Sequence, residues 1–218
     1  MFFEYTNLDI VIEDSFYDFA QKAWRFQDPG AFYYKIFYQG IKFPIYIIGL
    51  LSVSGYFYSR KKNIWHEKRK GMAIIGLTLI TLPLFIALVG KGVTNVHCPD
   101  DITRYGGGIP YVKVLEKYPV NPNSPDGKYP RGHCFPAGHA SGGFALLSLV
   151  CFYKGRRQKI WAFLFAMSMG TAMSVIQMLR GLHYLSHQLV TFLLALIFVS
   201  IFNLIIKDSY DHSTQTTK

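Results

Sequence analysis

The sequence predicts an all-α integral membrane protein, built as a polytopic helical bundle. Half of its 218 residues are hydrophobic and 17% are aromatic, and the apolar residues gather in long blocks that a water-soluble core rarely contains. The mean hydropathy is +0.18 although the formal net charge is +10. This charge lies in short clusters beside the apolar blocks, as in cytoplasmic loops near anionic lipid heads, and that placement argues against nucleic-acid binding.

Residues 1–40 precede the first apolar block and combine aromatic with acidic residues. Their apolar positions recur at mixed helical spacing, and Asp28-Pro29-Gly30 is a turn signal. We expect an interfacial or re-entrant region, and the alternative is a small soluble unit, although so short a segment rarely forms a core alone. The aromatic side chains expected at headgroup depth are Trp24, Phe32, Tyr33 and Tyr34.

Five apolar segments follow, with lengths that suit a bilayer. The third reaches that length only when its motif-bearing start is included. A loop rich in proline and glycine separates the second from the third, and a polar tail, expected in the cytoplasm, covers 207–218. The predicted spans are 41–58, 72–90, 138–153, 160–178 and 184–206, and the long loop is 91–137.

Lysine and arginine predict the orientation of these spans, because cytoplasmic loops are enriched in both. Basic clusters lie at 60–70 and 154–159, so these loops are expected in the cytoplasm. Loop 91–137 and the turn 180–186 then face the other side, and so does the N-terminus. No secretory signal is visible, which leaves three explanations: a short translocated tail, a dip of residues 1–40 into the membrane, or a preceding span.

Two histidine-bearing segments are expected to face this same water layer. The first runs from Arg131 to Phe144, where a Pro-Ala-Gly turn places His139 at the start of the third span. The second, Arg180-Gly-Leu-His183-Tyr-Leu-Ser-His187, opens the fifth span. Lys91 follows the second span on the same side, so these groups together suggest a site.

With these residues in place, the chain resembles the type 2 phosphatidic-acid phosphatase superfamily, whose helical bundle is shared with vanadium haloperoxidases. The family pattern has three blocks: Lys, six residues, Arg-Pro; then Pro-Ser-Gly-His; then Ser-Arg, five residues, His, three residues, Asp. Lys91 begins the first block, Pro136-Ala137-Gly138-His139 matches the second, and His183 takes the histidine of the third. The pattern's Arg, Ser, Arg and Asp are replaced by Cys98, Ala137, Gln177 and His187.

The resemblance implies a mechanism that needs no metal and no cofactor. His183 would attack phosphorus and form a phosphohistidine, while His139 would protonate the leaving oxygen and then activate water. His187 would fix the tautomer of His183 in place of the aspartate. The expected phosphate-binding residues are Lys91, Arg180, Arg131 and Gln177, with Asp100 or Asp101 supplying negative charge from the loop.

The function implied by the resemblance is a lipid-phosphate phosphatase of the bacterial inner membrane, with its site facing the periplasm. The substrates it admits are lipid A, undecaprenyl diphosphate, phosphatidic acid and phosphatidylglycerol phosphate, with the first two favoured because their phosphates are exposed there. The alternatives are a lipid-to-lipid phosphotransferase and, because of the replaced motif residues, a non-catalytic protein that binds lipid phosphates. The expected partners are the lipid substrate and the bilayer, and the sequence leaves the oligomeric state open.

Three cysteines are too few for a disulfide framework. Cys98 and Cys134 share the outer loop, which is oxidising in a bacterial periplasm, so we hypothesise a disulfide that ties this loop to the His139 motif. Cys151 lies in a span and is expected to pack. A zinc site is the alternative, although the spacing of the His-Cys pairs is not that of a zinc finger. Its ligands would come from His97, Cys98, His133 and Cys134, or from His183 and His187.

Overall fold

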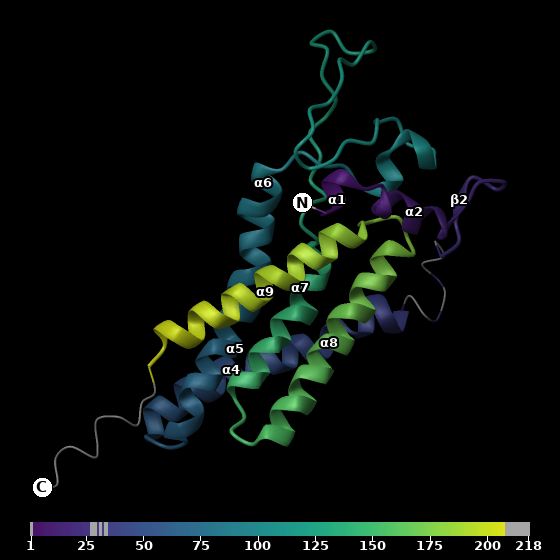
Figure 1. Cartoon of the computed structure of the whole chain (residues 1–218). Coiled ribbons are helices and arrows are strands. Elements are labelled where there is room, and N and C mark those ends of the chain that lie inside the picture. Colours follow the sequence, from purple (N-terminus) through teal and green to yellow (C-terminus); the bar gives the residue numbers. More distant parts are fainter. Residues whose placement is uncertain (1, 27–29, 31, 33–34, 208–218) are drawn as a thin grey trace, which may run out of the picture.

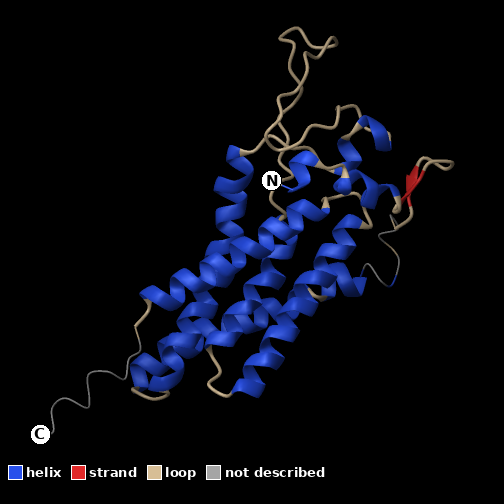
Figure 2. Ribbon diagram, viewed as in Figure 1, coloured by secondary structure: helices blue, strands red, loops and turns tan. Residues whose placement is uncertain are grey.

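The computed structural model describes residues 2–26, 30, 32 and 35–207. A helical bundle carries a small N-terminal unit and a long loop at one end (Figures 1 and 2). The α-helices are α1 (Phe2–Tyr5), α2 (Leu8–Asp14), α4 (Lys42–Lys62), α5 (His66–Phe85), α6 (Lys91–Val93), α7 (Gly138–Ala145), α8 (Arg156–Met178) and α9 (Leu185–Ile205). Shorter π or 3-10 segments are η1 (Lys35–Gly40), η2 (Ile86–Gly90), η3 (Pro99–Asp101), η4 (Thr103–Tyr105) and η5 (Leu146–Cys151), and strand β1 (Tyr17–Asp18) pairs antiparallel with β2 (Ala23–Trp24).

Among the described residues, three helices are long and apolar enough to cross a membrane: His66–Val93, Arg156–Met178 and Leu185–Ile205. The first of these is α5 continued through η2 into α6. The segment made of α7 and η5 is apolar but shorter. Each of the five predicted spans overlaps a helix of the structure, and the five-span topology itself stays a prediction.

Helix α4 has an apolar outer face although it is not one of those three. It has 21 residues and exposes large apolar side chains along its length, among them Phe43, Leu50 and Phe57. A contiguous apolar surface of this kind is unfavourable in water and suits contact with lipid or another protein. It therefore supports the prediction of a span at 41–58.

Helix α7 lies at the centre of the bundle and packs against α5, α8 and α9. It meets α8 backbone to backbone, because a Cβ atom on Gly143 would lie only 2.7 Å from the Cα of Gly170. Around this crossing the buried apolar side chains include Leu82, Phe144 and Leu146. The helix that begins at the predicted His139 motif is therefore held in the core of the bundle.

The turn between α4 and α5 is closed by Arg69, which the sequence places in an ordinary basic loop. Its side chain is only 6% exposed. The guanidinium donates to the hydroxyl of Ser59 (2.7 Å), the carbonyl of Ser59 (2.6 Å) and the side chain of Asn63 (3.2 Å). These bonds satisfy polar groups at the end of α4, which a helix terminus otherwise leaves to water.

The N-terminal unit docks on the start of the long loop. Arg104 donates two hydrogen bonds of 2.7 Å to the carboxylate of Asp14, and the hydroxyl of Tyr105 donates a third, of 3.0 Å. The ring of Tyr105 also packs against Tyr17 and Trp24, with centroids 5.2 and 4.9 Å apart. This contact fixes the unit at the end of the bundle where the loop projects (Figure 1).

Burial of Trp24 differs from the sequence expectation of a side chain at headgroup depth. Trp24 is 5% exposed, because it lies inside this aromatic cluster rather than at an outer surface. Phe32 is 78% exposed, and Tyr33 and Tyr34 lie outside the described residues.

Candidate active site

The two ends of the long loop run side by side and bring the first two motif blocks together. The hydroxyl of Thr94 donates to the carbonyl of Phe135 (2.6 Å), and the amide of Cys134 donates to the carbonyl of Val96 (2.9 Å). Gly132 permits this approach, because a Cβ atom there would lie 2.5 Å from the Val96 carbonyl group. The segment that carries Lys91 is thus paired with the segment that leads into α7.

Lys91 consequently lies against the first turn of α7. A Cβ atom on Gly138 would lie 3.8 Å from the ammonium nitrogen of Lys91. Gly90 also has to be small, since a Cβ atom there would lie 2.8 Å from the ring of Pro136. His139 is the next residue of α7, so a cation and an imidazole from separate motif blocks share one end of the bundle.

Cys98 and Cys134 are joined by a disulfide, with Cα atoms 5.2 Å apart and 36 residues of sequence separation. The alternative zinc set is not assembled around these sulfurs. His97 bonds to the carbonyl of Pro130 (2.9 Å), and His133 is exposed. The ligand atoms of Cys98, Cys134 and His183 do lie within 4.8 Å of one another, but the sulfurs of a disulfide are not the thiolates that zinc prefers.

The third block runs from the end of α8 through the turn into α9, and His183 in that turn lies directly beside this disulfide. The Nδ1 atom of His183 is 3.3 Å from the Sγ atom of Cys134 and 3.5 Å from the Nδ1 atom of His187. His183 is 4% exposed and His187 is 1% exposed. The ring of His187 is further enclosed by Phe135 and Tyr184, each with a centroid distance of 5.1 Å.

A cavity of about 620 Å³ opens between α4, α5 and α7. Lys42, Lys91 and His139 line it where these helices face the loop end of the bundle. The remaining wall is mostly apolar and includes Ile45, Tyr46, Leu79, Ile80, Pro83 and Met173. The cavity therefore has a positively charged end and a hydrophobic body.

Electrostatic coupling connects the residues of all three blocks. The charges of Lys91 and His139 act on His183, and those of Lys42, Lys91 and Arg180 act on His139. Burial lowers the pKa of His183 well below its ordinary value, and the neighbouring His187, Lys91 and His139 lower it further. His183 is therefore neutral at pH 7, which is the nucleophilic state of an imidazole.

The other predicted site residues have different surroundings. Arg131 donates to the carbonyl of Gly92, beside Lys91. Gln177 is 2% exposed, and its backbone carbonyl accepts a bond of 2.9 Å from the amide of Leu182. The roles of Arg131 and Gln177 in phosphate binding stay predictions.

The two loop aspartates lie near the disulfide and the turn that carries Arg180. The carboxylate of Asp101 accepts from the amide of Cys98 (3.1 Å) and lies 3.4 Å from His97. The amide of Asp100 donates to the carbonyl of Gly181 (2.9 Å), and its carboxylate interacts electrostatically with Arg180. Both aspartates therefore stabilise the loop, and none of these four contacts involves His183.

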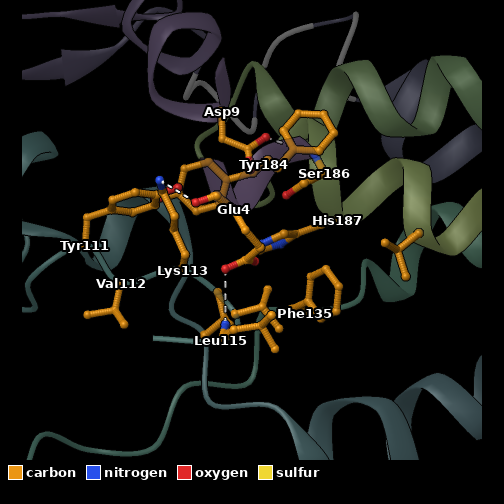
Figure 3. Close-up of a pocket in the computed structure, with 14 residues that line it drawn as sticks. Glu4, Asp9, Tyr111, Val112, Lys113, Leu115, Phe135, Tyr184, Ser186 and His187 are labelled. Carbon is orange, nitrogen blue, oxygen red and sulfur yellow. Dashed lines mark hydrogen bonds between the residues drawn. The ribbon is translucent and has the colours of Figure 1, made fainter. Parts of the chain in front are cut away.

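The N-terminal unit packs against the third block, a contact that the sequence does not predict. The carboxylate of Asp9 accepts from the amide of Ser186 (2.9 Å) in the first turn of α9. A second cavity, of about 240 Å³, has Asp9, Glu4 and His187 in its wall. Figure 3 shows how these side chains lie around it. In addition, Trp24 covers Gly181 so closely that a Cβ atom there would lie 2.1 Å from the indole.

Lys42 is a further residue of the site that sequence reasoning did not identify. A single lysine at the start of an apolar segment is usually a snorkelling side chain, so nothing in the local pattern marks it. Only the antiparallel packing of α4 on α5 brings it to the charged end of the cavity.

Comparison with known proteins identifies the family of the chain. The family model described as the PAP2 superfamily matches residues 71–211, which include Lys91, His139 and His183. No curated protein and no solved structure matches the chain. Members of this superfamily are phosphatases, which supports activity on phosphate esters, and the apolar helices support a membrane protein. Because the match covers more than half of the sequence, the chain belongs to the PAP2 superfamily.

Proposed function

We propose that this protein is a lipid-phosphate phosphatase. The observation that supports this substrate class is the cavity with Lys42, Lys91 and His139 at one end and an apolar wall over the rest. A phosphate at the charged end would leave its apolar chain along α4 and α5, where burial of that chain favours binding.

In the proposed reaction, one ring nitrogen of His183 attacks phosphorus, and the bond from phosphorus to the leaving oxygen breaks. His139 gives that oxygen a proton, so the dephosphorylated lipid leaves as an alcohol or, from a diphosphate, as a phosphate. His139 then removes a proton from water, which attacks the phosphohistidine and releases inorganic phosphate. Lys91, Arg180 and Lys42 neutralise the charge that builds on the phosphoryl oxygens.

We further propose the bacterial inner membrane as the location, with the charged end of the cavity facing the periplasm. The basic clusters near Arg60 and Arg156 support this orientation, because they lie at the opposite ends of α4 and α8 from the site. Lipid A and undecaprenyl diphosphate are the leading substrate classes, since their phosphates are exposed in that compartment.

The test is phosphate release by purified protein from a panel of lipid phosphates and from a short, water-soluble phosphate ester. We expect the long-chain lipids to be preferred, and His183→Ala and His139→Ala each to lose at least about 100-fold in kcat. His133→Ala is the matched control, because His133 is an exposed histidine of the same loop.

Product analysis separates hydrolysis from transfer to a second lipid, since transfer consumes an acceptor lipid and releases little inorganic phosphate. Full activity of His183→Ala would contradict the assigned nucleophile. A preference for the soluble ester over every lipid would contradict the substrate class.

A further inference from the structure

The Nδ1 atom of His183 is in contact with a sulfur atom. The Sγ atom of Cys134 lies 3.3 Å from it, and the Nδ1 atom of His187 lies 3.5 Å away. A distance of 3.3 Å is ordinary for a hydrogen bond to sulfur, whose radius is large, whereas 3.5 Å between two nitrogens is at the outer limit of a hydrogen bond. The sulfur is therefore the better partner of the two.

The chemistry of that sulfur fixes the direction of the bond. Cys134 is in a disulfide with Cys98, so its sulfur carries no proton and can only accept. A hydrogen bond along this contact therefore requires the proton of the neutral His183 ring to be on Nδ1, which leaves the lone pair on the other nitrogen. That nitrogen, Nε2, is the one available to attack phosphorus.

This sulfur contacts the nucleophilic histidine in a chain that lacks the aspartate of the family pattern. The pattern has an aspartate four residues after the nucleophilic histidine, and here that residue is His187, which brings no negative charge. We infer that the Cys98–Cys134 disulfide is the group that positions the nucleophile, holding the His183 ring in the reactive tautomer. This inference rests on the proposed function.

The disulfide is itself held rigidly enough to do this. Cys134 is 1% exposed, and its amide donates to the carbonyl of Val96 (2.9 Å). The amide of Cys98 donates to the carboxylate of Asp101 (3.1 Å). The sulfur also packs 3.0 Å from the carbonyl oxygen of Leu182, the residue before His183, so the disulfide lies directly beside the backbone of the proposed nucleophile.

Reduction of the disulfide should therefore inactivate the enzyme. A dithiol reductant supplies two electrons and two protons, the S–S bond breaks, Cys98 and Cys134 become thiols, and the reductant becomes a cyclic disulfide. The Sγ atom of Cys134 then carries a proton and is no longer tied to Cys98. The His183 ring loses both its fixed neighbour and the requirement that Nδ1 be protonated.

Three double variants separate positioning from simple stapling of the loop. Cys98→Ala with Cys134→Ala removes the sulfur, Cys98→Ala with Cys134→Asp places a carboxylate acceptor beside Nδ1, and Cys98→Ala with Cys134→Asn is its isosteric control. We expect the alanine pair to lose about tenfold or more in kcat with a KM within a few-fold of wild type. The aspartate pair should recover much of that loss, and the asparagine pair little, because an amide can turn its N–H₂ group towards the ring.

Equal kcat values for the aspartate and asparagine pairs, or wild-type kcat in the alanine pair, would overturn the inference. Should the variants fold poorly, treating folded wild-type protein with a dithiol tests whether kcat depends on the disulfide, and the ¹⁵N measurement below then separates positioning from stapling of the loop. Cys151→Ser, which removes the free cysteine, is the control and should behave as wild type. Kinetics unaffected by complete reduction would contradict the role.

An ¹⁵N spectrum of histidine-labelled protein provides a readout that does not depend on activity. The His183 signals, identified by their absence in His183→Ala, should show a protonated Nδ1 in the oxidised protein and a changed protonation pattern after reduction. A protonated Nε2 in the oxidised protein would overturn the positioning role even if lipid phosphates are hydrolysed. The expected spectrum in a protein that hydrolyses none of them would instead count against the proposed function alone.

Discussion

His183 has an unusual environment for a group that would become positively charged in the proposed mechanism. Among the residues that the structure describes, the groups whose charge acts on it are His187, Lys91 and His139, and all three disfavour its protonation. The same burial that keeps the ring neutral also limits its contact with water. The neutral nucleophile should therefore persist to lower pH than an exposed imidazole.

The loss of kcat/KM at acid pH that results from protonation of His183 should occur below the ordinary imidazole pKa of about 6.5. A lowered pKa means that the reactive neutral form is lost only as pH falls through that lower value. The measurement is kcat/KM against pH, with the ionisation of the substrate phosphate determined separately and divided out. An acid limb at or above pH 6.5 would contradict a buried, neutral nucleophile.

Glu13 is a second buried group with an altered pKa. It is fully buried, and neither carboxylate oxygen has a hydrogen-bond partner among the described residues. Burial, followed by the charges of Asp9 and Asp14, raises its pKa to about 9. The folded protein therefore retains a proton on Glu13 that the unfolded chain releases once the pH exceeds the ordinary pKa of 4.5.

Replacing Glu13 by Gln should stabilise the protein by an amount that grows with pH. The stability that wild type derives from the protonated group is complete below pH 4.5 and falls by up to about 1.4 kcal/mol per pH unit as the pH rises towards 9. Thermal unfolding of both proteins from pH 5 to 9 measures this. Glu67→Gln, at an exposed position, should show no such trend, and a constant difference for Glu13→Gln would argue against the raised pKa.

At the scale of elements, the turn between α8 and α9 is shaped by β2. Gly181 has a φ of +68°, which favours glycine, and the indole of Trp24 occupies the space that a side chain would need. Arg180 and His183 lie on either side of this glycine. The N-terminal unit thus shapes the segment that carries the proposed nucleophile.

Gly181→Ala should lower the free energy of unfolding by at least about 2 kcal/mol, because both the backbone conformation and the overlap with Trp24 oppose a methyl group. Its kcat should fall as the turn shifts. In a Trp24→Ala background the same change should cost only about 1 kcal/mol, the backbone part alone. The double-mutant cycle of unfolding free energies measures the difference, and strict additivity would show that the two residues are not coupled.

At the scale of the whole molecule, local sequence features predict the helices and the motif residues well. An apolar block of sufficient length is recognisable without knowing what packs against it, and the turn before His139 predicts the start of α7. Lys91 and His139 line one cavity and act electrostatically on His183, because each of the three lies at a helix end on the same side of the bundle. Alternation of the helices across the bundle is enough to predict that.

The contacts that refine the site are not visible in the sequence, because they join distant segments. Asp9 and Ser186 are separated by 177 residues, and neither lies in a recognisable pattern with the other. Lys42 reaches the cavity only through the packing of α4 on α5, and Arg69 is buried because it completes the end of α4. In each case tertiary packing decides the role of a residue whose local context suggests an exposed charge.

The crossing of α7 and α8 at Gly143 and Gly170 also determines how deep His139 lies in the bundle. With no side chain between the two backbones, this crossing cannot slide without a clash, and His139 stands one helical turn, ~6 Å along the axis, from Gly143. The imidazole of His139, the proposed general acid and base, is therefore held at a fixed depth relative to the glycine pair. If the substrate is a lipid phosphate, as proposed, its phosphate has to reach that depth, so a headgroup seated higher or lower in the leaflet would be discriminated by position as well as by charge.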